Sequence, residues 1–201
     1  MNTQVVQFFW DIGSPYSYLA TTQIRNIVDK YQADLDLRPF LLGAVFKETG
    51  NKPPITLPAK SQYMPQDLNN WCEFYQVPLT FPKDFPINSV MPMRAAVAAH
   101  RLGNGETFAL SLYHAYWGEG QDVSQPEILQ QVANACGLNG NELLELTQDQ
   151  SIKDELRENV ALAVHKGAFG APTFYLGEKM FWGVDHLPLL EFFLAKQSSS
   201  T

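Results

Sequence analysis

Two serines near the start of the chain stand at a spacing that often carries redox chemistry. The stretch DIGSPYSYLA, residues 11–20, places Ser14 and Ser17 with two residues between them. A dithiol protein would carry its two cysteines at this spacing, at a turn from a strand into a helix. Two hydroxyls cannot exchange disulfides, which argues strongly against dithiol chemistry at this position.

Ser14 has two interpretations on local grounds. It is a good N-cap for the helix that follows, with Pro15 as the first helical residue, and this use needs no further function. The same geometry offers free backbone N–H groups and the positive end of the helix dipole, which favour a bound anion. A hydroxyl there can donate a hydrogen bond to a thiolate and lower its pKa. Because no base stands beside Ser14, we do not expect it to be a covalent nucleophile.

Two short segments near the end of the chain could bind a peptide-like ligand. In FGAPTFYL, Pro172 cannot donate a hydrogen bond, which leaves the N–H and C=O groups of Ala171 free to pair with a ligand. In FWGVDHLPLL, Asp185 is either the N-cap of the last helix or a carboxylate that receives the ammonium group of an amino-acid-like ligand. Gly183 and Val184 would then bring the backbone close to that ligand.

Several polar side chains before and within the middle of the chain could hold a carboxylate. Lys47, Asn51 and Lys52 stand in the loop-like stretch FKETGNKPP, and Asn88 stands in FPINSVMPMRAA. Residues of these types are usually solvated, and that is the simpler interpretation. Lysines and an amide in a loop stiffened by proline could instead bind an anionic group of a substrate.

The other candidates for metal or thiol chemistry are isolated. The histidines show neither metal-ligand spacing nor triad partners: His100, His114, His165 and His186. Cys72 and Cys136 are 64 residues apart in helix-like surroundings, which predicts two free thiols and no disulfide. We therefore expect no metal site.

Hydrophobic periodicity predicts the elements that must position these residues. The first part of the chain is predicted as strand 5–10, helix 14–32 and strand 35–42, and the last part as strands 171–176 and 179–183 followed by helix 185–197. About a hundred residues of helical pattern lie between these parts. The predicted helices there cover 67–76, 92–102, 106–120 and 124–138, with a further pair in 141–167.

A βαβ unit joined to a ββα unit is the thioredoxin arrangement. The order of elements therefore predicts an α/β protein with a thioredoxin-like fold and a large all-helical insertion between its two halves. We expect a discontinuous thioredoxin-like domain of residues 1–43 and 165–201, and a helical insertion domain of residues 44–164.

Composition limits the classes of function. The 201 residues, 45% of them hydrophobic, are enough to bury a sizeable core. A net charge of −7 without a cluster of lysine or arginine argues against a nucleic-acid partner. No apolar run approaches the length of a membrane span, and the first ten residues lack a signal-peptide pattern. We expect a cytoplasmic protein without a membrane partner.

Taken together, the motifs resemble those of a known family. The following stretches occur in the order found in 2-hydroxychromene-2-carboxylate isomerases: FFWDIGSPYSYLA, GNKPP, LPAK…YMPQDLNNW, FPINSVMPMRAA and GAPTFYLGEKMFWGVDHLPLLE. These isomerases belong to the DsbA-like group that includes kappa-class glutathione transferases. The resemblance spans nearly the whole chain, and its specificity comes from the order of motifs that would each be weak alone.

The resemblance implies that glutathione binds on the thioredoxin face. Ser14 matches the family's catalytic serine and would donate a hydrogen bond to the glutathione sulfur. Ala171, before a cis Pro172, would pair with the cysteinyl backbone. The stretch that would hold the γ-glutamyl end comprises Trp182, Gly183, Val184 and Asp185. The residues that would contact an aromatic acid substrate are Lys47, Asn51, Lys52 and Asn88.

The implied reaction is cis–trans isomerisation of 2-hydroxychromene-2-carboxylate or a similar intermediate of aromatic degradation. Reversible addition of the thiolate would make the C=C bond single, and rotation and elimination would follow. A kappa-like glutathione transferase or peroxidase of broader range is an alternative, as are a dithiol oxidoreductase and a non-catalytic glutathione-binding module. The missing C-x-x-C pair argues against the dithiol enzyme.

One position departs from the family pattern. His186 follows Asp185 where family members often carry arginine. A titratable histidine binds an anion more weakly than a permanently charged guanidinium, so this departure affects the expected affinity for glutathione and not the fold. The resemblance also implies a homodimer.

Overall fold

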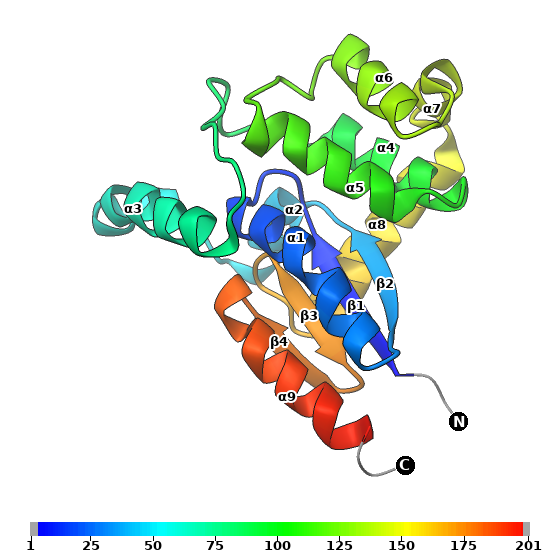
Figure 1. Ribbon diagram of the computed structural model, residues 1–201. Helices are drawn as coiled ribbons and strands as arrows, with labels where there is room; N and C mark the ends of the chain where they lie inside the picture. Colours follow the sequence, from blue (N-terminus) through cyan, green and yellow to red (C-terminus); the bar gives the residue numbers. More distant parts are fainter. Residues whose placement is uncertain (1–3, 199–201) are drawn as a thin grey trace.

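The first strand is the centre around which the sheet is built. β1 (Val5–Trp10) pairs in parallel with β2 (Asp34–Pro39) and antiparallel with β3 (Thr173–Leu176). β4 (Lys179–Trp182) pairs antiparallel with β3, which gives the order β2-β1-β3-β4. The computed structural model describes residues 4–198, and in this part of the chain the predicted thioredoxin-like fold is confirmed (Figure 1).

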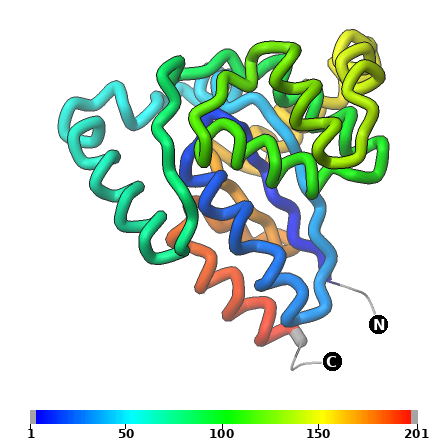
Figure 2. The backbone as a smooth tube through the Cα atoms, turned by 45° about the horizontal axis from the view of Figure 1, so that its top comes forward, coloured from blue at the N-terminus to red at the C-terminus, as the bar shows by residue number. Residues whose placement is uncertain are grey.

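Helices cover both faces of the sheet. α1 (Pro15–Lys30) and α9 (Leu187–Ser198) lie side by side on one face, as Figures 1 and 2 both show. α2 (Leu42–Thr49) and α8 (Gln150–His165) contact each other, and their side chains form a second, smaller core. Successive side chains of a strand point to opposite faces of the sheet. Phe8 of β1 therefore belongs to the larger core, and Phe9 belongs to the smaller one.

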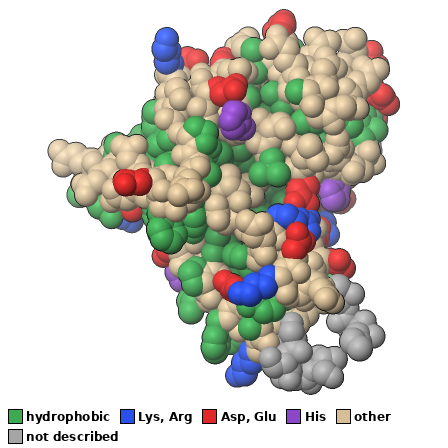
Figure 3. Space-filling model, viewed as in Figure 1, with side chains coloured by type: hydrophobic (Ala, Val, Ile, Leu, Met, Phe, Trp, Pro, Cys, Tyr) green, Lys and Arg blue, Asp and Glu red, His purple; other side chains and the backbone are tan. Residues whose placement is uncertain are grey.

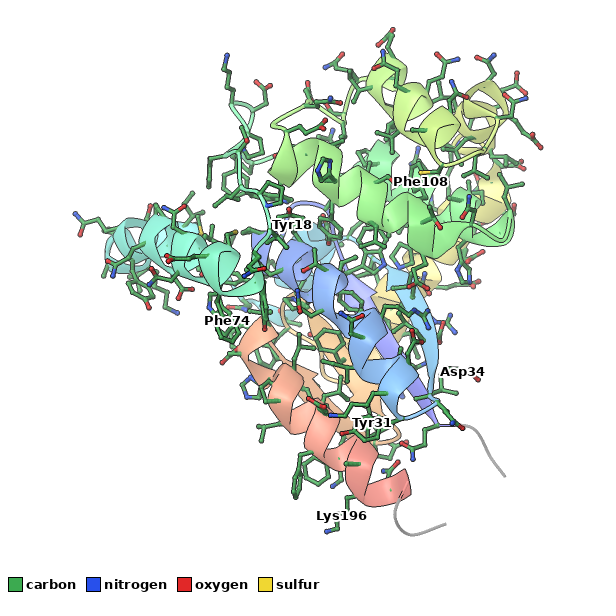
Figure 4. The ribbon with its side chains drawn as sticks, in the orientation of Figure 1. Tyr18, Tyr31, Asp34, Phe74, Phe108 and Lys196 are labelled. Atoms are coloured by element: carbon green, nitrogen blue, oxygen red, sulfur yellow. The ribbon has the colours of Figure 1, made fainter. Side chains whose placement is uncertain are left out.

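Most of the remaining helices form a layer above the carboxyl end of β1 (Figure 1). They are α4 (Val90–Arg101), α5 (Gly105–Tyr113), the π-helical segment His114–Gly118, α6 (Pro126–Ala135) and α7 (Gly140–Leu146). Tyr18 of α1 and Phe108 of α5 are labelled in Figure 4 and belong to one continuous core. The Tyr18 hydroxyl donates to the carbonyl of Pro78 at 2.7 Å, and burial raises its pKa to about 12.

α3 (Pro58–Tyr75) stands apart from the sheet and from the helical layer, and it packs against α1 (Figure 1). Its buried side chains are Met64, Leu68 and Cys72, which recur at every fourth position and so lie on one face of the helix. Figure 3 shows hydrophobic side chains exposed near α3 and along α9, where Phe74 is 72% and Phe192 is 59% exposed. α3 therefore uses only a narrow stripe for packing and leaves its other sides open.

Three predicted elements differ from the observed ones. Strand 35–42 ends at Pro39, and α2 begins at Leu42, so that Lys47 lies on a helix and not in a loop. The helix predicted from residue 67 already starts at Pro58 and continues through Pro65. An internal proline removes one backbone hydrogen bond, here the one toward Ser61, and the rest of the helix continues around it. The helix predicted at 106–120 changes from α-helical to π-helical geometry at His114.

The division into 1–43 with 165–201 and 44–164 stays a prediction. α2 and α8, both within or at the edge of the predicted insertion, contribute to the smaller core beside β1. Cys72 is buried, Cys136 is half-buried, and both are free thiols. Among residues 4–198, no three ligating side chains are grouped as a metal site. In the same range, no helix has the length and apolar character that a membrane crossing requires.

Candidate functional site

Ser14 closes the turn between β1 and α1 and caps the helix. Its backbone is extended, with φ −100° and ψ 111°, while Pro15 occupies the first helical position. Ser14 Oγ accepts the N–H of Ser17 at 3.1 Å, and the side chain is almost fully buried. The N-cap interpretation is thus observed, and Ser14 reaches this position because serine and proline suit the first turn of a helix.

The segment before β3 lies directly against Ser14. Ser14 Oγ donates a hydrogen bond to the carbonyl of Ala171 at 3.0 Å. The peptide bond between Ala171 and Pro172 is cis. Two segments that are 157 residues apart in the sequence therefore meet at one hydroxyl group.

A buried carboxylate holds the turn that presents Ser14. Asp11 Oδ1 accepts the N–H of Gly13 at 2.8 Å, and Oδ2 accepts the N–H of Leu42 at 2.8 Å and the hydroxyl of Ser89 at 3.0 Å. Burial raises the pKa of Asp11, and these three hydrogen bonds act in the opposite direction. The carboxylate joins the turn to α2 and to the residue that precedes α4.

The helical layer holds the same turn from the other side. Tyr113 donates its hydroxyl hydrogen to the carbonyl of Asp11 at 2.8 Å, and Trp117 Nε1 donates to the carbonyl of Ile12 at 2.7 Å. Both donors are fully buried. Consecutive carbonyls of the turn are thus fixed by side chains from more than a hundred residues farther along the chain.

A cavity of about 510 Å³ opens beside Ser14. The residues on its polar side include Ser14, Tyr16, Asn51, Lys60, Tyr63, Asp67, Ala171, Gly183 and Asp185. The residues on its apolar side include Leu42, Phe46, Pro53, Pro54, Ile55, Met64, Trp71, Phe85, Trp182 and Val184. A pocket with apolar walls and a few converging polar groups is the usual form of a small-molecule site.

Two glycines shape part of the cavity wall. Gly183 has φ +99°, and its N–H donates to the carbonyl of Pro172 at 3.0 Å. A Cβ atom at this position would contact the carboxylate of Asp185. A Cβ atom at Gly170 would contact the indole nitrogen of Trp182. Glycine is therefore needed at both places to bring the backbone close to these side chains.

Most of the residues predicted as a site come together here. The cavity lining includes Ser14, Asn51, Ala171, Trp182, Gly183, Val184 and Asp185, and Pro172 follows Ala171 directly. Asn51 reaches this place because its side-chain N–H donates to the carbonyl of Phe169 at 2.8 Å, which ties its loop to the segment before β3. Asp185 lies in a short turn, Val184–His186, before α9 begins at Leu187.

Three predicted substrate contacts lie elsewhere. Among the described residues, the lining of the cavity excludes Lys47, Lys52 and Asn88. Lys47 is exposed on the last turn of α2, whose residue Phe46 faces the cavity instead. Asn88 Oδ1 accepts the N–H of Val90 at 3.3 Å at the start of α4. The predicted loop is in part a helix, α2, and this accounts for the position of Lys47.

α3 supplies site residues that the sequence analysis did not identify. Tyr16 donates to Asp67 at 2.7 Å, and Tyr63 donates to the other oxygen of Asp67 at 3.2 Å. Burial and the neighbouring Asp67 raise the pKa of Tyr16, so it stays a neutral hydrogen-bond donor at physiological pH. Lys60 stands on the same helix and also faces the cavity. Lys60 and Asp67 are seven residues apart, a spacing that puts them on one face of a helix. This spacing could have identified them only if a helix had been predicted before residue 67.

A second hollow, of about 560 Å³, lies between α1, α5 and α6. Its polar side chains include His114 and Glu119, which are 3.5 Å apart and about half exposed. Its lining does not include Ser14 or Ala171 among the described residues, and α1 contributes Tyr18 and Thr22 to it. The cavity beside Ser14, which contains most of the predicted site residues, is therefore the candidate functional site.

Comparison with known proteins gives a consistent family. The model of the DSBA-like thioredoxin domain matches residues 5–195. A 2-hydroxychromene-2-carboxylate isomerase from Sphingobium xenophagum is 31% identical over 96% of this chain and 98% of its own. Human glutathione S-transferase kappa 1 is 30% identical over 96% of this chain and 92% of its own. A solved structure of a 2-hydroxychromene-2-carboxylate isomerase superposes with a TM-score of 0.88, at 25% identity, over 96% of this chain and 95% of that one.

Proposed function

Because this chain belongs to the DSBA-like thioredoxin family, in the group of 2-hydroxychromene-2-carboxylate isomerases and kappa-class glutathione transferases, we propose that it is a glutathione-dependent enzyme. The observation that carries the proposal is the convergence of the Ser14 hydroxyl, the Ala171 main chain and the Gly183–Asp185 segment on one cavity. When bound there, glutathione supplies a thiolate that can add reversibly to an electrophile.

The residues of the cavity suit the three parts of glutathione. Ser14 would donate to the sulfur at the positive end of α1, and the main chain of Ala171 would pair with the cysteinyl residue. Asp185, with the backbone at Gly183 and Val184, would receive the γ-glutamyl ammonium group. Among the described lining residues, Lys60 has the one positively charged side chain, and it would bind a carboxylate.

For the reaction itself, we propose cis–trans isomerisation of an aromatic carboxylate like 2-hydroxychromene-2-carboxylate. The chain would stabilise the thiolate through Ser14 and hold the ring of the substrate against Phe46, Trp71 and Phe85. Holding the two reactants together in one cavity lowers the entropic part of the barrier. The name and full-length similarity of the Sphingobium relative support this choice.

A second candidate is a glutathione transferase or peroxidase with uncharged substrates. Lys47 and Lys52, the two cations expected to bind a substrate carboxylate, are outside the cavity lining, so Lys60 would face the carboxylates of both glutathione and the substrate. An uncharged electrophile places no such demand on Lys60. The similarity to human kappa transferase supports the same alternative.

One assay separates these candidates. The purified protein is mixed with 2-hydroxychromene-2-carboxylate, with and without glutathione, and the absorbance of the trans product is followed. We expect a glutathione-dependent rate. Turnover of 1-chloro-2,4-dinitrobenzene or a hydroperoxide in its place would establish the second candidate. Retention on immobilised glutathione without any turnover would identify a binding module.

The role of Ser14 is tested by replacing it with alanine. Ser14→Ala removes a charge-assisted hydrogen bond of about 1.5–3 kcal/mol, and we expect turnover to fall by roughly 10- to 150-fold. Ser17→Ala is the matched control, since Ser17 is also buried on α1 but does not line the cavity. Equal rates for the two variants would contradict the proposed role.

A further inference from the structure

The single hydroxyl hydrogen of Ser14 is already in use. Ser14 Oγ donates to the carbonyl of Ala171 at 3.0 Å and accepts from the N–H of Ser17 at 3.1 Å. The direction of the first bond is fixed, because a carbonyl oxygen can only accept and a serine hydroxyl has one hydrogen. Ser14 therefore cannot donate to a bound sulfur and keep its bond to Ala171 at the same time.

Turning the hydroxyl toward a sulfur would leave the Ala171 carbonyl without this donor. Ser14 is only 3% exposed and Ala171 is half-buried, so a ligand that fills the cavity also keeps water away from the place that the hydroxyl would vacate. A partly buried carbonyl that loses its donor is unfavourable, and this cost opposes donation to the sulfur. The cost disappears if the ligand itself brings an N–H group to the Ala171 carbonyl.

A cysteinyl residue has the required dimensions. Its amide nitrogen and its sulfur are separated by three bonds, which span roughly 3 Å in a gauche rotamer. The two protein atoms they would meet, Ala171 O and Ser14 Oγ, are 3.0 Å apart, and both residues line the cavity. One cysteinyl residue can thus offer its N–H to the carbonyl and its sulfur to the hydroxyl.

We propose that Ser14 and Ala171 form an exchange pair, in which the amide N–H of the ligand takes over the Ala171 carbonyl and releases the Ser14 hydroxyl to donate to the sulfur. This inference rests on the proposed function and adds a specificity to it. The site activates thiols that carry an amide N–H on the carbon next to the thiol-bearing carbon, as cysteinyl peptides do, in preference to simple thiols. In the exchange the thiol proton leaves to solvent, and the hydroxyl hydrogen changes only its acceptor.

The test compares glutathione with an analogue of nearly the same shape, in which an ester oxygen replaces the cysteinyl amide N–H. Binding to the full chain is measured by calorimetry, and ionisation of the bound thiol is followed by the ultraviolet absorbance of the thiolate as pH is varied. For glutathione we expect the thiol pKa to fall from about 8.5 to below about 7.5. For the bound ester analogue we expect a thiol pKa that stays near about 8.5.

Ser14→Ala provides the internal control, because it removes the hydroxyl that is exchanged. In this variant we expect glutathione and the ester analogue to have the same thiol pKa. An ester analogue that cannot displace glutathione even at large excess would support the amide requirement at the level of binding. Equal lowering of the thiol pKa for both ligands in the unmodified protein would overturn the exchange pair. Glutathione that does not bind, or binds with an unchanged pKa, would overturn the proposed function instead.

Discussion

At the scale of single residues, the backbone conformation of Gly183 determines how close the Asp185 carboxylate can lie to the main chain beside the cavity. Its φ of +99° and ψ of 154° belong to a region that residues with a side chain rarely adopt. The space where a Cβ atom would lie is occupied by the carboxylate of Asp185. The glycine thus allows Asp185 to lie close to the backbone that follows β4.

We expect Gly183→Ala to weaken glutathione binding as well as stability. The alanine would strain the backbone by about 1–3 kcal/mol and push the Asp185 carboxylate away. Gly177→Ala is the control, since Gly177 also has a positive φ, of +59°, but nothing within 4 Å of its Cβ position. Calorimetric titration with glutathione should show a loss of affinity for Gly183→Ala alone, and equal affinity for both variants would contradict this role of Gly183.

The residues of the site could be predicted from sequence where local rules apply. Ser14 before Pro15 is a helix start, and Pro172, which lacks a backbone N–H, leaves the main chain of Ala171 free to pair with a ligand. Both positions follow from residue type. Lys60 and Asp67 could not be found in this way, because Pro65 lies between them and proline usually ends a helix. Which lysine faces the cavity depends on the packing of α3 against α1, and no local pattern records that contact.

At the scale of elements, the end of α5 and the π-helical segment are the support of the Ser14 turn. Tyr113 and Trp117 are four residues apart, on one face of their helix, and donate to the adjacent carbonyls of Asp11 and Ile12. π-helical turns of this kind are often found where a functional site needs a special alignment of side chains. The sequence predicted a helix here but not the change of geometry at His114, since periodicity does not distinguish the two helix types.

We expect Trp117→Phe to destabilise the protein more than Trp10→Phe. Both tryptophans are buried and would lose the same atoms, but Trp10 Nε1 has no hydrogen-bond partner among the described residues. Trp117→Phe leaves the buried carbonyl of Ile12 without its donor, which adds a cost of about 1–3 kcal/mol. Urea unfolding of the two variants measures this difference in the free energy of unfolding, and equal losses would show that the bond to Ile12 contributes nothing.

At the scale of the whole molecule, the Asp11 carboxylate connects parts that the sequence suggested to be separate. It joins the Ser14 turn to α2, which lies on the other side of the sheet from α1, and to Ser89, which leads into the helical layer. Composition and element order could predict the thioredoxin-like half and the helical half, but not the buried carboxyl group that ties them together. Asp11 stands next to Ile12 in an ordinary strand-to-turn sequence, and only the folded structure shows what surrounds it.

The contribution of Asp11 to the free energy of unfolding depends on pH, and the burial of Asp11 determines the sign of this dependence. Burial raises the pKa of Asp11 in the folded protein above its value in the unfolded chain, so the folded state binds the proton more tightly. The contribution of Asp11 to stability is therefore fully present below the unfolded value, near about 3.9, and is lost as pH rises through the folded pKa. Asp11→Asn removes this titration and also one acceptor oxygen, which is either the one that accepts from the N–H of Gly13 or the one that Leu42 and Ser89 share.

We expect the free energy of unfolding of the unmodified protein, minus that of Asp11→Asn, to decrease as pH rises from the acidic range toward neutrality. Subtracting the variant cancels the titration of the other carboxylates, which both proteins share. Asp34→Asn, an exposed carboxylate at the start of β2 that is labelled in Figure 4, is the control for the loss of one negative charge. Urea unfolding at a series of pH values measures the difference. A difference that increases with pH would mean that the hydrogen bonds from Gly13, Leu42 and Ser89 outweigh burial, and that the carboxylate is held in its charged form.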